Sequence, residues 1–159
     1  METKKTGGSA IDISAEEWIQ ALRLVHDYAY HYDGGDLEAL AGVLMEDMTF
    51  DSDVPSFPVH TRSRAEIIAA LQNRKDHWSA VRRKHFLTNF HVVEYQRNRI
   101  RTQTYLFETH TRPGGLPEIR QAGLYDDIIV KDSEGKWRFA ARKYRTDVLP
   151  AEEPATRSQ

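Results

Sequence analysis

An aspartate and two histidines occupy positions at which their side chains could meet and do acid–base chemistry. Asp33 ends a helical pattern, and stepping back by helical spacing reaches Ala29, His26, Leu22 and Trp18, so Asp33 continues the stripe that should face the core. A carboxylate on the inward face of a helix is costly unless it has a partner. His85 and His110, each in a segment that resembles a strand, are candidate partners, and we expect Asp33 to meet one or both across a pocket.

An Asp–His pair of this kind is typical of general acid–base catalysis. The carboxylate orients the imidazole and stabilises the imidazolium that forms when the ring takes a proton. Tyr32 precedes Asp33, and we place it in the same pocket. The alternative is that each residue is ordinary: Asp33 a helix end in solvent, His85 a surface or satisfied core histidine, and His110 an exposed loop residue.

Strand periodicity adds candidate substrate-binding residues. From position 85, alternate residues share a face, which places Leu87 and Asn89 beside His85, although Asn89 could instead be a structural polar residue. Leu106 and Glu108 share a face with His110. Two neighbouring aspartates take opposite faces, Asp126 with Leu124 and Ile128, and Asp127 with Tyr125 and Ile129. The substrate-binding residues that we select from these faces are Leu87, Asn89, Leu106, Leu124 and Asp126.

The motifs of metal and nucleotide sites do not occur in the chain. It has no cysteine, no His-Glu-x-x-His, no acidic loop of calcium-binding spacing and no glycine-rich phosphate loop. His85 and His91 share a predicted strand face, but strand rise would separate them by ~20 Å, too far to hold one ion. We therefore expect no metal and no cofactor.

Bulk composition indicates a globular protein of one domain. The chain has 159 residues, of which 40% are hydrophobic and 29% charged. Its 22 basic and 24 acidic residues give a formal charge of −2, so neither nucleic acid nor an anionic membrane is an expected partner. No apolar run approaches the ~20 residues of a transmembrane helix, and the lysines near the start precede no apolar segment of a secretory signal. A cytoplasmic location is the expectation.

Three helices are predicted, and they come early in the chain. Capping boxes at Ser14 and Ser63, each with glutamate three residues later, predict helices over 15–33 and 64–78. Gly34 is the predicted left-handed stop of the first helix. Asp36 can cap a short helix over 37–44.

Strands dominate the second half. Alternation and β-branched content predict strands over 48–54, 84–95, 99–111, 119–131 and 137–148. Helices followed by hairpin-linked strands indicate an α+β fold, in which helices cover one face of an antiparallel sheet. We expect a flexible arm over 1–12, one domain over 13–149 and a disordered tail over 150–159.

Three segments together resemble a known family. Tyr32-Asp33-Gly-Gly-Asp36, Arg83-Lys-His85-Phe-Leu-Thr-Asn89 and Gly135-Lys-Trp137-Arg-Phe139 resemble the SnoaL-like branch of the nuclear transport factor two-like superfamily, over roughly residues 14–148. The resemblance implies a curved antiparallel (mixed) sheet wrapped around a long N-terminal helix, a cone-shaped α+β barrel. It also implies a homo-oligomer, a dimer or trimer.

Within that branch the pattern is most similar to the scytalone dehydratases. Tyr32, Asp33, His85 and His110 match their catalytic positions. Ser52 stands where those enzymes have a tyrosine and Asp126 where they have an asparagine, residues that help hold water and substrate. The resemblance implies a cofactor-free lyase or isomerase of dehydratase type for a hydrophobic cyclic substrate: a polyketide, a steroid or an aromatic ring compound. His85 would remove a proton from carbon, and His110 or Tyr32 would donate one.

A second resemblance points away from catalysis. The small subunits of ring-hydroxylating dioxygenases are similar to this chain around Arg83-x-His85 and Asn89, and they serve as assembly subunits for a polypeptide that holds the iron. A small-molecule binding module is a further alternative. An assembly subunit should co-purify with a larger iron–sulfur partner, whereas a lyase should be active alone.

Overall fold

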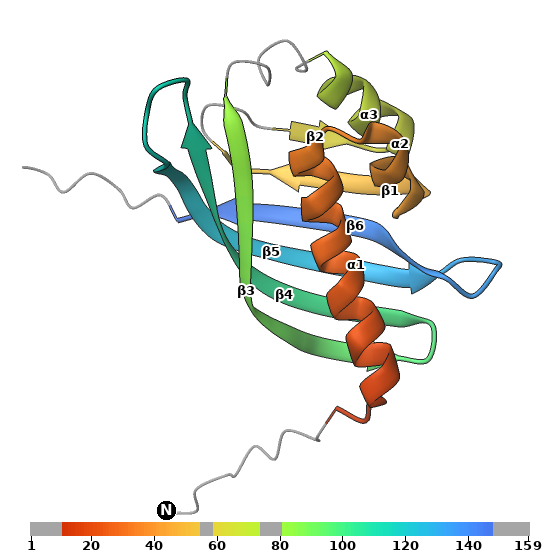
Figure 1. Ribbon diagram of the computed structural model, residues 1–159. Helices are drawn as coiled ribbons and strands as arrows, with labels where there is room; N and C mark the ends of the chain where they lie inside the picture. The colour runs from red at the N-terminus through yellow and green to blue at the C-terminus, as the bar shows by residue number, and fades with distance from the viewer. Residues whose placement is uncertain (1–10, 55–58, 74–80, 148–159) are drawn as a thin grey trace, which may run out of the picture.

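The computed structural model describes residues 11–54, 59–73 and 81–147. Three helices and six strands follow one another along the chain (Figure 1): α1 (Ala15–Gly34), α2 (Leu37–Gly42), β1 (Leu44–Ser52), β2 (Val59–Thr61), α3 (Arg64–Gln72), β3 (Arg82–Gln96), β4 (Arg99–Thr111), β5 (Glu118–Lys131) and β6 (Trp137–Thr146). The expected arm and tail lie outside the described residues, except for positions 11 and 12.

The strands form one sheet in the order β2-β1-β6-β5-β4-β3. β1 pairs with β6 in parallel and every other neighbouring pair is antiparallel, which confirms the expected mixed α+β sheet. Figure 1 shows the sheet curving around α1, with α2 and α3 beside the β1–β2 end. The fold therefore leaves one end of the concave face open between α1, α3 and the strands.

Local sequence signals explain where α1 begins and ends. The Ser14 hydroxyl accepts a hydrogen bond from the Glu17 backbone N–H at 3.2 Å, as the capping box predicts. The left-handed residue at the end is Gly35, with φ 69°, and not Gly34 as predicted. Its N–H binds the Tyr32 carbonyl, so α1 extends one residue further and Asp33 lies within its last turn.

The buried stripe of α1 is rotated from the expected one. Its buried residues include Ala21, Leu24, Val25 and Tyr28, whereas His26 is exposed. These side chains pack in one cluster with Leu40 and Leu44 and with the inward-facing residues of the sheet, among them Ile100, Ile129 and Phe139. Packing against the sheet thus fixes α1 along its length and sets the position of its C-terminal turn.

Other elements also differ from the predictions. β1 begins at Leu44, where we expected a helix to continue, because Leu44 pairs with Phe139 of β6. The short β2 was not predicted and completes the sheet edge beside β1. α3 ends at Gln72, and the remainder of the helix predicted over 64–78 falls largely outside the described residues. None of the helices in the described part of the chain is both long enough and apolar enough to cross a membrane.

Candidate active site

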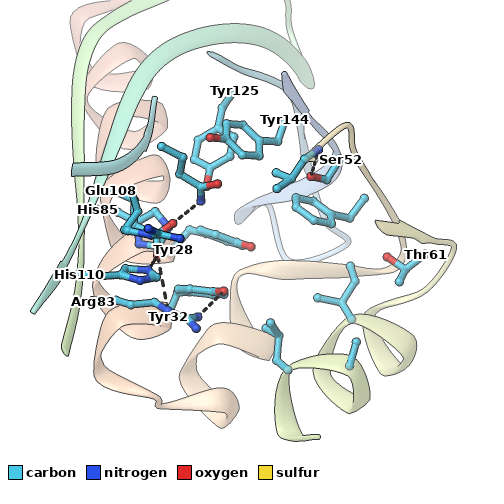
Figure 2. A pocket seen from close by; sticks show the side chains of 17 residues that line it. Tyr28, Tyr32, Ser52, Thr61, Arg83, His85, Glu108, His110, Tyr125 and Tyr144 are labelled. Carbon is cyan, nitrogen blue, oxygen red and sulfur yellow. Dashed lines mark hydrogen bonds and ion pairs between the residues drawn. The ribbon is translucent and has the colours of Figure 1, made fainter. Parts of the chain in front are cut away.

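A cavity of about 240 Å³ opens at the end of the concave face. Figure 2 shows Arg83, His85, Glu108 and His110 on one side of it and Ser52 and Thr61 on the other. Charged and amide side chains form the wall that β3, β4 and β5 provide: Arg83, His85, Glu108, His110, Arg120 and Gln121. Aromatic, hydroxyl and aliphatic groups form the rest, from α1, α3, β1, β2, β5 and β6: Tyr28, Tyr32, Phe50, Ser52, Val54, Thr61, Ile67, Ala70, Leu71, Tyr125 and Tyr144.

The expected Asp–His pair is present and buried. The Asp33 carboxylate accepts two hydrogen bonds from His85, one from ring Nδ1 at 2.6 Å and one from the backbone N–H at 2.8 Å. Both side chains are less than a tenth exposed. Because the carboxylate is an acceptor, it assigns the ring hydrogen to Nδ1 and leaves Nε2 as the nitrogen that can take a proton.

The position of Asp33 in the fold explains why its carboxylate needs the two N–H donors of His85. A carboxylate in the last turn of a helix faces the negative end of the helix dipole, an unfavourable position. Burial removes the water that would otherwise solvate it. The first residues of β3 lie against this end of α1 and provide two N–H donors from one residue. The pair is therefore local in space although 52 positions separate its members.

A second carboxylate lies in the same wall. Glu108 is directly opposite His85 in the β3–β4 register, and its Oε2 is 4.0 Å from His85 Nε2. The Glu108 side chain is buried, and its Oε1 accepts from His110 Nε2 at 2.7 Å. Gln121 of β5, its register partner on the other side, donates to Oε2. Hydrogen bonds thus join Gln121 and His110 to Glu108, and His85 lies opposite Glu108 at 4.0 Å, so the wall is a row of polar side chains across three adjacent strands.

Tyrosines surround the dyad. The Tyr32 ring lies edge-on to the His85 ring at 5.0 Å, and its hydroxyl accepts from Arg83 at 3.3 Å. Burial raises the pKa of Tyr125 and of Tyr144 above the ordinary ~10. These phenols therefore stay neutral and remain hydrogen-bond donors, and the Tyr144 hydroxyl is buried without a hydrogen-bond partner among the described residues.

One predicted substrate-binding residue is on the wrong face. Asn89 is exposed and has φ 53°, in the left-handed region. It lies at a register shift between Thr88 and His91, a β-bulge. Strict alternation placed Asn89 beside His85, but the bulge turns its side chain out and Phe90 and Val92 inward. Asparagine tolerates the left-handed conformation that this position requires.

The prediction that Asp126 and Leu124 face the cavity and bind substrate is also wrong. Asp127 and Tyr125 are the members of β5 that face the concave side, so Asp126 and Leu124 face outward. Asp126 binds the Arg101 guanidinium with both oxygens, at 2.7 and 2.8 Å. Arg101 holds the pKa of Asp126 below its ordinary value. The resemblance to the dehydratases had indicated Asp126, and the structure places the adjacent Asp127 on the concave side.

The remaining predicted residues lie on the concave side. Ser52 lines the cavity. Its hydroxyl accepts from the Val54 backbone N–H at 3.3 Å. Leu87 and Leu106 pack against Tyr125 and Tyr144, so they support the cavity wall and do not line it, contrary to the prediction.

Several residues of the cavity were not selected from sequence, and for one a signal was available. Glu108 is two positions from His110 and therefore shares its face, a signal that gives its position but no role. Tyr28, Tyr125 and Tyr144 are buried aromatic residues that sequence alone assigns to the core. Among the described residues, no three histidine or acidic side chains converge closely enough to hold a metal ion.

A curved mixed sheet around a long helix, with a polar cavity at the open end, defines an α+β barrel of the nuclear transport factor two-like superfamily. Within this class, the chain belongs to the SnoaL-like domain family, which matches residues 14–143. No curated protein matches the chain.

Solved structures share the fold at low sequence identity. ActVI-ORFA from Streptomyces coelicolor is 21% identical, with 83% of this chain and 98% of that chain covered and a TM-score of 0.73. A candidate scytalone dehydratase from Novosphingobium aromaticivorans is 24% identical, with 91% and 96% covered and a TM-score of 0.70. A variant of Rv3472, a protein of unknown function from Mycobacterium tuberculosis, is 26% identical, with 84% and 75% covered and a TM-score of 0.71.

Proposed function

We propose that the protein is a cofactor-free lyase or isomerase of dehydratase type, which acts on a hydrophobic cyclic substrate. The observation that carries the proposal is the Asp33–His85 dyad. Both Asp33 oxygens are used to orient His85, so Nε2 is the nitrogen left for chemistry beside the cavity. A buried imidazole fixed in one tautomer by a carboxylate is suited to taking a proton from carbon.

The reaction begins with removal of a proton beside a carbonyl group. His85 Nε2 takes the proton, and Asp33 stabilises the imidazolium that results. The electron pair left on carbon delocalises as an enolate, and neutral phenols such as Tyr125 and Tyr144 can stabilise its oxygen. A proton donor that lines the cavity then assists the departing hydroxyl group. The sequence assigns that role to His110 or Tyr32, and both line the cavity.

The lining supports a flat, neutral substrate. Five aromatic side chains and several aliphatic ones line the cavity together with the polar residues. The volume of about 240 Å³ is just below the range of ~300–1,000 Å³ for ligand pockets, which favours a compound of one or two rings. A polyketide-derived or other aromatic ring compound fits this description better than a steroid.

One observation favours the assembly-subunit alternative. Phe86 and Phe107 stack at 4.7 Å on the convex side of the β3–β4 hairpin, where Phe86 and Tyr105 are exposed. An apolar outer face of this kind suits an interface, either with a second copy of the chain or with a larger subunit. An assembly role alone, however, gives no reason for a buried dyad at the wall of a cavity.

The test measures proton abstraction directly. A panel of hydroxylated and halogenated ring compounds, with 1-tetralone as a simple ring ketone, is incubated with the protein in D₂O, and exchange at the carbon beside the carbonyl is followed by NMR. We expect wild-type protein to accelerate exchange and Asp33→Asn to lose most of this activity. Asp27→Asn, on the solvent-facing side of the same helix, is the matched control and should behave as wild type.

Either of two results would reject the proposal. Asp33→Asn could be as active as the parent, which would remove the dyad from catalysis. Wild-type protein could leave every compound of the panel unchanged and co-purify with a larger iron–sulfur polypeptide, which would support the assembly subunit.

A further inference from the structure

We propose that Glu108 is a further catalytic residue, which carries the proton from His85 to the departing group, and that His110 positions Glu108. This inference rests on the proposed function and identifies its second acid–base group. It changes the role that the sequence assigns to His110.

Glu108 lies on the route from the base to the rest of the cavity. Its Oε2 is 4.0 Å from His85 Nε2, the nitrogen that Asp33 leaves unoccupied. The two residues are cross-strand partners in adjacent strands, so the sheet itself fixes their separation. A substrate atom that reaches His85 Nε2 therefore also lies beside the Glu108 carboxylate.

The neighbours of Glu108 are hydrogen-bond donors and a cation. Gln121 donates to Oε2 and His110 Nε2 lies 2.7 Å from Oε1. The Arg83 guanidinium is 3.5 Å from Oε1. Gln121 contributes an N–H, and Arg83 adds a positive charge, which makes a carboxylate the matching partner. Glu108 can then accept a proton from His85.

His110 is already hydrogen-bonded to Glu108. Its Nε2 makes the 2.7 Å contact with Oε1, and its side chain is more exposed than that of Glu108. If His110 gave up the Nε2 proton to a substrate, the Glu108 carboxylate would lose the hydrogen bond that this ring donates. We therefore assign His110 the role of holding and orienting Glu108.

The proton path balances without solvent or a co-reactant. First, the substrate C–H bond breaks, the His85 Nε2–H bond forms, and the electron pair remains on the substrate as an enolate. Next, Nε2 and Glu108 Oε2, which are 4.0 Å apart without substrate, approach to hydrogen-bond distance; the Nε2–H bond breaks and a Glu108 Oε2–H bond forms, which returns His85 to its neutral form. Finally, the substrate C–O bond breaks, the leaving oxygen takes the proton from Oε2 and departs as water, and the enolate electron pair forms the double bond.

Two probes separate the roles of His85 and Glu108. 1-Tetralone exchanges its proton in D₂O without losing a group, so it needs only the base. 3-Hydroxy-1-tetralone loses water to give fluorescent 1-naphthol, so it also needs a proton for the leaving oxygen. For Glu108→Gln we expect exchange within a few-fold of wild type and elimination reduced by ~10²-fold or more. Asp33→Asn should lose both reactions, and Glu94→Gln, on the exposed side of β3, should lose neither.

The substitutions at His110 test its positioning role. His110→Gln keeps an N–H donor for Glu108 and should lose less than ~10-fold in kcat for elimination, whereas His110→Leu should lose substantially more. If His110 were itself the acid, both variants would lose elimination equally. That result, or a Glu108→Gln variant that eliminates water at the wild-type rate, would overturn the inference while the exchange data still support the proposed function.

A measurement without substrate completes the test. In protein labelled with ¹⁵N-histidine, ring nitrogen shifts identify the tautomer of each residue. We expect His110 to carry its hydrogen on Nε2 in wild type and to lose this preference in Glu108→Gln, with His85 remaining on Nδ1 in both. A wild-type His110 with its hydrogen on Nδ1 would overturn the inference. If wild-type protein acts on neither probe, the proposed function fails, and the tautomers still show whether Glu108 is held as described.

Discussion

Two buried carboxylates in this protein are each paired with a cationic or potentially cationic side chain, and the pairs serve different purposes. Asp33 binds His85 at the wall of a cavity. Asp127 of β5 binds Arg142 of β6 through two hydrogen bonds of 2.7 and 2.8 Å, and both side chains are completely buried. The first pair can exchange a proton with a ligand, whereas the second is closed to solvent and substrate.

Arg142 is enclosed by aromatic rings. Its guanidinium carbon lies 3.9 Å from the ring centres of Tyr28 and Tyr125 and 4.5 Å from that of Phe139. Burial raises the pKa of Asp127, and the charge of Arg142 opposes that shift. Arginine does not deprotonate in proteins, and both side chains are completely buried, so the pair is closed to proton exchange with a substrate.

The two pairs are physically connected. Tyr28 and Tyr125 line the cavity on one side and enclose Arg142 on the other. The Asp127–Arg142 pair therefore supports the aromatic surface against which a substrate would rest. The comparison teaches that the partner and its access to the cavity, and not the carboxylate, decide whether a buried ion pair does chemistry or builds structure.

An Asp→Asn change in each pair should separate the catalytic role of the Asp33–His85 pair from the structural role of the Asp127–Arg142 pair. The largest expected effect is the loss of activity in Asp33→Asn. Asp33→Asn should lower kcat/KM by ~10²–10⁴-fold, because His85 loses both its orientation and the charge that stabilises the imidazolium. The free energy of unfolding should fall by no more than ~2 kcal/mol, since the amide that replaces the Asp33 carboxylate retains a hydrogen-bond acceptor. Steady-state kinetics and urea unfolding measure the two quantities, and a variant that loses stability but not activity would contradict the assignment.

Asp127→Asn should have the opposite effect, a large loss of stability and a small loss of activity. Removing one member of a buried ion pair leaves the Arg142 charge uncompensated and costs ~3–5 kcal/mol of stability. We expect the midpoint of urea unfolding to fall strongly, while activity per folded molecule at low temperature falls much less than in Asp33→Asn.

The double variant Asp127→Leu with Arg142→Met sharpens this test. Hydrophobic replacement of both members removes the unpaired charge, so most of the lost stability should return. If the double variant is less stable than Asp127→Asn alone, the guanidinium stack on Tyr28 and Tyr125 contributes more than the ion pair.

The smallest effect is expected for a third pair, Asp126 with Arg101, on the convex face. Its guanidinium is partly exposed, so Asp126→Asn should cost less than ~1 kcal/mol at pH 7. Arg101 lowers the pKa of Asp126 in the folded state, so the contribution of the pair is present above the unfolded pKa of ~3.9 and is lost as the pH falls through the lower folded value. Unfolding of both proteins between pH 2 and 7 should show their stabilities converging at the acid end.

Local signals predicted most of the fold. Ser14 and Ser63 cap α1 and α3 through the N–H groups that the capping boxes specify, and alternation located β3 to β6 to within a few residues. The site was predicted where the partners follow from chemistry. A buried Asp33 needs a donor, which made His85 and His110 the candidates, and the family resemblance indicated His85 as the base; the structure pairs Asp33 with His85 across 52 positions.

The errors arose where side chains were assigned to a face of the sheet by counting alternate residues along a strand. Asn89 was placed beside His85 because alternation was continued through a bulge that only the paired strand reveals. Asp126 was selected because the family resemblance aligned it with an asparagine of the dehydratases, but a shift of one position exchanges the faces of a strand, and the buried residue is Asp127.

The sequence by itself therefore determined most of the elements, the fold class and the need of Asp33 for a partner such as His85 or His110, because caps, alternation and the cost of burying a carboxylate act locally or through residue type. Only the tertiary structure decided that Glu108 faces His85, that Asp127 and not Asp126 is buried, and that Tyr28 and Tyr125 separate the cavity from Arg142. Each of these depends on strand register and on sheet curvature, which arise from the packing of the whole sheet around α1.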